Sequence, residues 1–119
     1  MKYVWTTIMV KNLQESLAFY QEIIGLPIKK RFFANQTREI AFLGEGETQV
    51  ELIEQKDATF VIGNAITLGF KVESLQKALE FVAQKGIPVE SGPFQPNEHT
   101  QFFFILDPNG VRIQFAQLS

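Results

Sequence analysis

Apolar residues recur three or four positions apart in two stretches of the chain, which is the spacing of one face of an α-helix. The first stretch lies between Asn12 and Gly25, and the second between Ser74 and Gly86. Asparagine and serine are favoured caps at the start of a helix, and glycine readily takes the left-handed conformation in which many helices end. The pattern therefore predicts two amphipathic helices, whose apolar stripes are Leu13, Leu17, Tyr20 and Ile24 in the first and Leu75, Leu79 and Val82 in the second.

The segments around these helices have the composition of β-strands. Tyr3–Val10 is rich in β-branched and aromatic residues, and strand geometry would put Trp5, Thr7 and Met9 on one face. Residues 92–97 contain glycine and two prolines and are expected to form a loop. The remaining strands are expected at residues 28–34, 37–44 and 47–54 in the first half, and at 66–72, from 87 to 89, 100–106 and 111–118 in the second.

The last two predicted strands are joined by Asp107-Pro108-Asn109-Gly110. Proline suits the second position of a type I turn, and glycine tolerates the positive φ that often follows. We therefore expect a β-hairpin at this point.

The helical stretch and its flanks occur twice. Val10 to Pro27 and Val72 to Pro88 share Val, Leu, Gln, Leu, Phe, Gly and Pro in the same order, and one single-residue gap aligns them. Self-similarity of this kind indicates that one supersecondary unit is used twice. We therefore predict a single domain of two βαβββ modules, residues 1–54 and 66–119, joined by a linker at residues 55–65.

Composition narrows the classes of partner. With 119 residues, 45% of them hydrophobic, the chain can bury a core without disulfides. A net charge of −2 and the lack of any run of Lys or Arg argue against nucleic acid and membrane partners. The chain has no cysteine and no long apolar segment of the kind found in signal peptides and membrane helices. We expect a cytoplasmic protein whose partner is a small molecule.

Several motifs lie on the repeated unit in a fixed order. They are Val-Lys-Asn-Leu at the first helix, Phe-Tyr followed by Gly-Leu-Pro, Val-Glu-Leu in a strand, and Asp-Pro-Asn-Gly before the last strand. Together they resemble the vicinal oxygen chelate superfamily, which includes glyoxalase I, extradiol dioxygenases and bleomycin-resistance proteins. The resemblance implies an α+β fold in which the two modules form a curved, mixed eight-stranded sheet with a concave cup and with helices on the outer face. It also implies a homodimer.

The metal enzymes of that superfamily hold a divalent ion with side chains from four strands, typically His or Glu. The resemblance assigns the four positions to Trp5, Glu51, Thr67 and Gln114. Trp has no ligating atom, and the neutral oxygens of Thr and Gln are weak ligands for a transition metal. One carboxylate alone does not hold a divalent ion, so we predict a metal-free site with no cofactor and do not expect glyoxalase activity.

The same cup is instead a candidate binding surface. Twelve phenylalanines are an unusually large share, and Trp5 at a ligand position suggests a stacking surface. Glu51 would lie among apolar residues, either as an anchor for a ligand or as a relic carboxylate satisfied by neighbours such as Gln114 or Thr67. The candidate ligand-binding residues are Trp5, Thr7, Glu51, Thr67, Phe102, Phe104 and Gln114.

Three functional interpretations stay open. The first is a metal-independent protein that binds an amphipathic or aromatic molecule, as in the bleomycin-resistance branch. The second is an enzyme: either a metal-dependent lyase, transferase or dioxygenase with the substituted ligands Glu51, His99 and Gln114, or a metal-free isomerase with Glu51 as base. The third is an inert or regulatory module. No nucleophile arrangement is visible, and the single histidine, His99, is expected at the rim.

Overall fold

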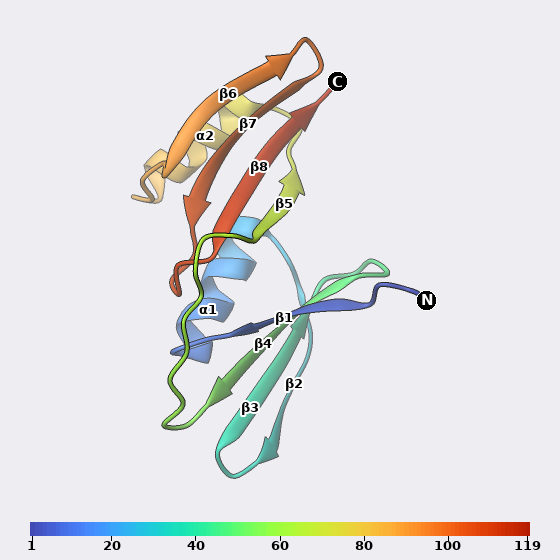
Figure 1. The fold of residues 1–119 in the computed structure, drawn as a ribbon, viewed down its shortest axis with the longest axis vertical. Helices are drawn as coiled ribbons and strands as arrows, with labels where there is room; N and C mark the ends of the chain where they lie inside the picture. Colours follow the sequence, from blue (N-terminus) through green and yellow to red (C-terminus); the bar gives the residue numbers. More distant parts are fainter. The chain divides into compact units, whose positions relative to one another are not determined.

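The computed structural model describes all residues from 1 to 119 and divides into two compact units, Met1–Val61 and Ile62–Ser119 (Figure 1). Each unit is a βαβββ module, as the sequence repeat predicts. The first contains β1 (Trp5–Met9), α1 (Leu13–Phe19), a π-helical turn η1 (Tyr20–Ile24), β2 (Ile28–Asn35), β3 (Arg38–Leu43) and β4 (Gln49–Gln55). The second contains β5 (Thr67–Lys71), α2 (Leu75–Gln84), β6 (Ser91–Asn97), β7 (Thr100–Leu106) and β8 (Arg112–Leu118).

The strands of each unit form a four-stranded mixed sheet with the same topology. The orders are β1-β4-β3-β2 and β5-β8-β7-β6. The first strand of each unit runs parallel to the last, and the other neighbours are antiparallel. The α+β class and the duplicated module are therefore confirmed. The continuous eight-stranded sheet and the single-domain organisation depend on how the units pair, and they stay predictions.

The helical segment formed by α1 and η1 begins and ends where the sequence predicts, although its last turn is π-helical. The Asn12 side chain accepts a hydrogen bond from the backbone N–H of Glu15 at 2.9 Å. Gly25 ends the helical segment with a φ of +88°, in the left-handed region that glycine allows at little cost. Leu13, Leu17 and Tyr20 are buried, so the predicted apolar stripe is the packed one. No helix is long and apolar enough to cross a membrane.

A hydrogen bond from the first residue of each helix to a side chain of the last strand also stabilises the helix start, and the sequence did not predict it. Glu54 at the end of β4 accepts a hydrogen bond from the backbone N–H of Leu13 at 2.7 Å. In the second unit, Gln117 of β8 accepts from the backbone N–H of Leu75 at the same distance. The first N–H groups of a helix have no partner within it, so each last strand satisfies a donor of the helix that packs on it.

Strand parity divides each sheet into two faces. On the face that carries α1, the register aligns Ile8 with Leu52 and Leu52 with Ala41, and all three are buried. On the α2 side of the second sheet the buried residues are Phe103, Ile105, Ile113 and Phe115. The opposite face, which we call the helix-distal face, holds the alternate residues of the same strands.

The predicted loop at residues 92–97 and the predicted strand at 87–89 are both wrong. The strand β6 occupies Ser91–Asn97 instead. It is an edge strand that pairs only with β7, and its register shifts between Ser91 and Phe94 and again before Asn97. Proline lacks a backbone N–H and is tolerated at sheet edges and irregularities, which is why Pro93 and Pro96 do not prevent a strand here.

The turn between β7 and β8 follows the prediction and is reinforced by a side chain. Gly110 has a φ of +93°, and its N–H donates to the Asp107 carbonyl at 3.1 Å. The carboxylate of Asp107 also accepts from the backbone N–H groups of Asn109 and Val111, at 2.7 and 2.8 Å. Both Asp107 and Asn109 are buried, so this turn is a fixed part of the second unit.

The strand-to-helix bond at Glu54 makes a testable contribution to stability. Glu54→Ala leaves the Leu13 N–H without its acceptor, and we expect the free energy of unfolding to fall by about 1–2 kcal/mol. Glu54→Gln keeps an acceptor of the kind that Gln117 provides, so its loss should be less than half as large. Urea denaturation of the three proteins measures this, and equal stability of all three would contradict the role of the bond.

Candidate ligand-binding faces

The helix-distal face of the first unit carries a row of chemically different side chains. The register aligns Thr7 of β1 with Glu51 of β4, Glu51 with Phe42 of β3, and Phe42 with Lys30 of β2. A hydroxyl, a carboxylate, an aromatic ring and an ammonium therefore follow one another across all four strands. Trp5 and Met9 flank the row on β1.

Glu51 is the buried polar group of this face. Only 9% of it is exposed, and its Oε1 accepts a hydrogen bond from the Thr7 hydroxyl at 2.5 Å. A buried carboxyl group is strongly destabilising unless it is hydrogen-bonded, and the Thr7 hydroxyl supplies this bond to Glu51. Within the first unit the donor to Glu51 is Thr7, which was not expected from the sequence. The donors expected from the sequence, Gln114 and Thr67, belong to the second unit, and their contact with Glu51 stays a prediction.

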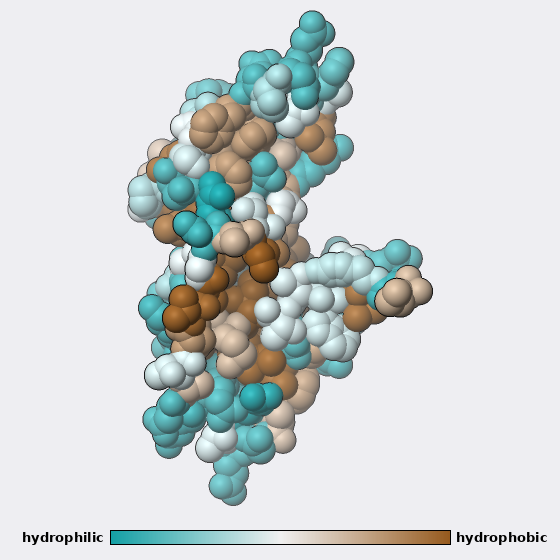
Figure 2. All heavy atoms as spheres, viewed as in Figure 1, coloured by the Kyte–Doolittle hydropathy of each residue, from teal (hydrophilic) through white to brown (hydrophobic).

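Aromatic side chains surround this carboxylate. Trp5 packs edge-on against Phe42 with ring centroids 5.3 Å apart, and Phe32 stacks on Phe42 at 6.5 Å. Lys30 Nζ lies 4.8 Å from the centroid of the Phe42 ring, within the range of a cation–π contact. Trp5 is still 49% exposed and Phe32 is 40% exposed, so the rings have surface left for another molecule. Figure 2 shows that apolar atoms reach the surface in both units.

The second unit repeats the row with other residues. Here the register aligns Gly69 of β5 with Gln114 of β8, Gln114 with Phe104 of β7, and Phe104 with Ser91 of β6. Gln114 thus takes the place of Glu51, and Phe104 that of Phe42. A Cβ on Gly69 would lie 3.2 Å from Gln114 Oε1, so glycine leaves room for the amide where the first unit has Thr7.

Three phenylalanines cluster on this second face. Phe94, Phe102 and Phe104 have ring centroids 5.6 to 6.4 Å apart. The predicted binding residues Thr67, Phe102, Phe104 and Gln114 all lie on this face, and Trp5, Thr7 and Glu51 all lie on that of the first unit. The structure therefore brings the predicted residues together as two groups, one in each unit.

Arg112 is the cation of the second face. Its guanidinium lies 4.0 Å from the centroid of the Phe104 ring and forms an ion pair with Glu90 at 3.2 Å. A hydrogen bond from the Ser91 hydroxyl is the largest cause that lowers the pKa of Glu90; partial desolvation opposes it, and Arg112 adds to it. Glu90 therefore stays ionised beside Arg112.

The chain matches the family model described as the glyoxalase/bleomycin resistance protein/dioxygenase superfamily over residues 2–115. The chain belongs to this superfamily. It is 32% identical over 126 residues to a lactoylglutathione lyase of Neisseria meningitidis serogroup A, which covers 98% of this chain and 91% of the relative. It is also 32% identical over 120 residues to the uncharacterised protein YwbC of Bacillus subtilis, with 94% of each chain covered.

A solved structure of the superfamily supports the fold. The trypanothione-dependent glyoxalase I of Leishmania major superposes with a TM-score of 0.84 over 98% of this chain and 86% of that one. The sequences are 20% identical, so this likeness speaks for the fold alone.

The residues at the superfamily's metal positions do not fit a resident divalent ion. Trp5 offers no ligating atom and packs on Phe42, and Glu51 already accepts a bond from Thr7. Nowhere do three or more His, Cys, Asp or Glu side chains gather in a group that could hold a metal. His99, named in the substituted-ligand alternative, is an exposed residue at the turn between β6 and β7, as expected for a rim histidine.

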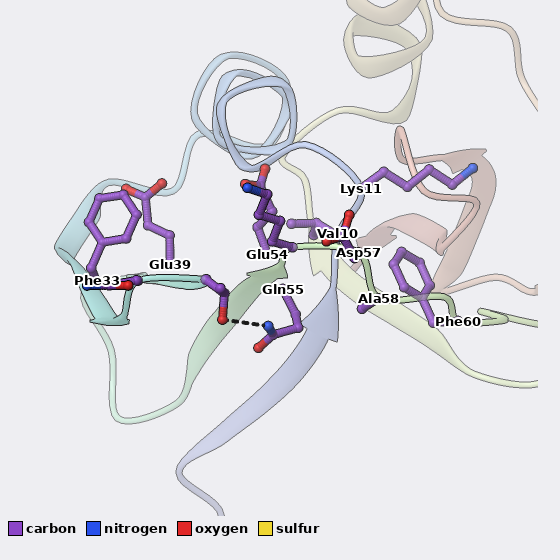
Figure 3. A pocket seen from close by; sticks show the side chains of 12 residues that line it. Val10, Lys11, Phe33, Glu39, Glu54, Gln55, Asp57, Ala58 and Phe60 are labelled. Atoms are coloured by element: carbon purple, nitrogen blue, oxygen red, sulfur yellow. Dashed lines mark hydrogen bonds between the residues drawn. The ribbon is translucent and has the colours of Figure 1, made fainter.

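A separate hollow of about 510 Å³ lies in the first unit (Figure 3). It lies at the end of the sheet and is bordered by residues 55–58 and Phe60, and none of the predicted binding residues lines it. Its polar groups are largely engaged: Glu54 caps α1, Glu39 pairs with Arg31 at 2.7 Å, and Gln55 donates to Thr37. We do not take it as the functional site.

Sequence reasoning missed Lys30 and the pairing of Arg112 with Glu90. Lys30 is one of three consecutive basic residues, and nothing in that run distinguishes the one that contacts a ring. Arg112 and Glu90 are 22 positions apart, and most of the strand that begins just after Glu90 was predicted as a loop. Both contacts follow from which residues of neighbouring strands are aligned, so only a correct prediction of strand register would have revealed them.

The lowered pKa of Glu90 predicts a pH dependence of stability. The folded-state pKa lies below the ordinary value of 4.5, so the stabilisation is fully present above that value and is lost as the pH falls through the folded pKa. Urea denaturation from about pH 6 to about pH 3 should therefore show a steeper loss of stability for the native protein than for Glu90→Gln. Glu98→Gln, at the exposed turn, is the control and should follow the native protein. Parallel curves for native protein and Glu90→Gln would contradict the prediction.

Proposed function

We propose that this protein binds a small amphipathic or aromatic molecule on its helix-distal sheet faces, without a metal ion. The observation that carries the proposal is the carboxylate of Glu51, held by Thr7 among exposed rings at the position where the superfamily's enzymes have a metal ligand. Small-molecule sites typically combine apolar and aromatic walls with a few fixed polar groups. This face has that composition.

Each group on the first face has a distinct use in binding. Trp5 and Phe32 offer aromatic surface for stacking. Glu51 accepts one hydrogen bond from Thr7 and, as a carboxylate, can accept more from a ligand N–H or O–H. A hydrogen bond to a charged acceptor is stronger than one between neutral groups. A flat apolar molecule that carries a hydrogen-bond donor fits this arrangement.

The second face supports the same proposal with neutral polar groups. Gln114 lies beside Phe104 and offers both a carbonyl and an amide, while Thr67 adds a hydroxyl on the neighbouring strand. Phe102 and Phe104 supply the apolar surface. The proposal thus assigns ligand contacts to Trp5, Thr7, Glu51, Thr67, Phe102, Phe104 and Gln114, and no catalytic residue.

The proposal includes a cytoplasmic homodimer with no nucleic acid or membrane partner. The net charge of −2 supports the exclusion of polyanions, and members of this superfamily are often dimers. A monomer in sedimentation equilibrium at micromolar concentration would contradict the dimer.

A second candidate is a metal-dependent lyase with substituted ligands. The 32% identity to a protein named lactoylglutathione lyase favours it. The donor set of Trp5, Glu51, Thr67 and Gln114 speaks against it, because this activity would need an ion bound through Glu51. The metal content of the protein decides between the two candidates.

Binding can be measured with the neutral fluorescent dye phenylnaphthylamine, an apolar aromatic amine with one N–H donor. We expect saturable quenching of Trp5, the single tryptophan, as the dye binds. Glu51→Gln replaces the charged acceptor with a neutral one, so the dissociation constant should rise by about tenfold.

The control is Glu39→Gln, which removes a carboxylate from the opposite face of the same sheet. It should bind the dye as the native protein does. No saturable quenching in any of the proteins, or equal affinity of Glu51→Gln and native protein, would contradict the anchoring role of Glu51.

A further inference from the structure

We propose that the ligand carries an acidic group, a carboxylate or sulfonate next to an aromatic ring, and that Arg112 binds this group on the helix-distal face of the second unit. The inference rests on the proposed function and specifies the class of ligand. Arg112 itself is not one of the superfamily's four metal positions.

Arg112 is held in one place by its neighbours. Its guanidinium stacks on Phe104, and its Nε and Nη2 donate to the same Glu90 oxygen at 3.3 and 3.2 Å. Nη2 also lies 3.4 Å from the Ser91 hydroxyl. A guanidinium fixed on a ring loses little conformational freedom when it binds an anion, because its geometry is already set.

Arg112 also lies where a ligand on this face would reach it. It is aligned with Thr67 on β5, and it precedes Gln114 by two positions on β8, so the three side chains share one face. The bonds to Glu90 and Ser91 use Nε and Nη2 and leave Nη1 with no protein partner. About 25% of the Arg112 side chain is exposed. A carboxylate or sulfonate can therefore bind at Nη1 while the aromatic ring that carries it lies against the phenylalanine cluster.

Stability alone gives little reason for this ion pair. Partly exposed ion pairs contribute little to folding, and the side chains of Arg112 and Glu90 are 25% and 33% exposed. Glu90 has a second effect, because its charge competes with any anion that approaches Arg112. The pair thus orients the guanidinium and weakens its attraction for acids, and these two effects can be separated by mutation.

Two matched dyes test the inference. Anilinonaphthalene sulfonate and phenylnaphthylamine share the same aromatic body, and only the first carries an acid. The measured quantity is the ratio of their dissociation constants for the native protein and for Arg112→Gln, Arg112→Lys and Glu90→Gln. Near-UV circular dichroism checks that each variant keeps its native packing.

The inference predicts changes in both directions. Arg112→Gln should raise the dissociation constant of the sulfonate dye by about tenfold and change that of the neutral dye by less than about twofold. Arg112→Lys should recover only part of this loss, because an ammonium does not stack on the Phe104 ring as the planar guanidinium does and is held less firmly in place. Glu90→Gln keeps an acceptor for Arg112 but removes the competing charge, so sulfonate binding should tighten severalfold.

Arg31→Gln is the control, because Arg31 forms a similar pair with Glu39 on the α1 side of the first sheet. This substitution should leave the dissociation constants of both dyes unchanged. An unchanged dye ratio in Arg112→Gln would overturn the inference while leaving the proposed function intact, as would a loss of sulfonate preference in Lys30→Gln in place of Arg112→Gln. Binding of neither dye would overturn both.

Discussion

A four-stranded sheet has two faces, and each unit of this protein has one helical segment to cover them. The helix buries the face that carries Leu52 in the first unit and Ile113 in the second. On the other face, no helix of the same unit covers the side chains, so hydrogen bonds and contacts among these side chains must stabilise them. In the first unit this condition is met by the bond from Thr7 to Glu51 and by the rings around it, and in the second by Phe104, Arg112 and Glu90.

The two helix-distal faces share a plan and differ in chemistry. Each has a central phenylalanine, Phe42 or Phe104, aligned with a polar residue on the last strand and in contact with a cation. Gene duplication accounts for the shared plan, because the same βαβββ unit has the same register. The differences, a carboxylate against an amide and an ammonium against a guanidinium, give the two faces distinct chemistry.

Much of the fold could be predicted because its signals are local. The helix caps, the left-handed glycines and the turn at residues 107–110 depend on a few neighbouring residues. The repeat predicted two units with the same βαβββ order of elements along the chain. The edge strand β6 could not be predicted in this way, since its prolines are typical of a loop and only pairing with β7 makes it a strand. Because side chains alternate between the two faces of a strand, the sequence could predict that Trp5, Thr7 and Glu51 share a face. The donor to Glu51 and the partners of Arg112 could not be predicted, because they depend on the register between strands that are distant in sequence. Residue types at the metal positions, in contrast, could be read directly once the family pattern was aligned.

The central claim is that Glu51 anchors an organic ligand and does not hold a metal. Its most direct test is the metal content of protein purified without chelator and then titrated with Zn²⁺, Ni²⁺ and Mn²⁺. The account predicts far less than one bound ion per native chain. One ion per chain that is lost in Glu51→Gln would contradict it.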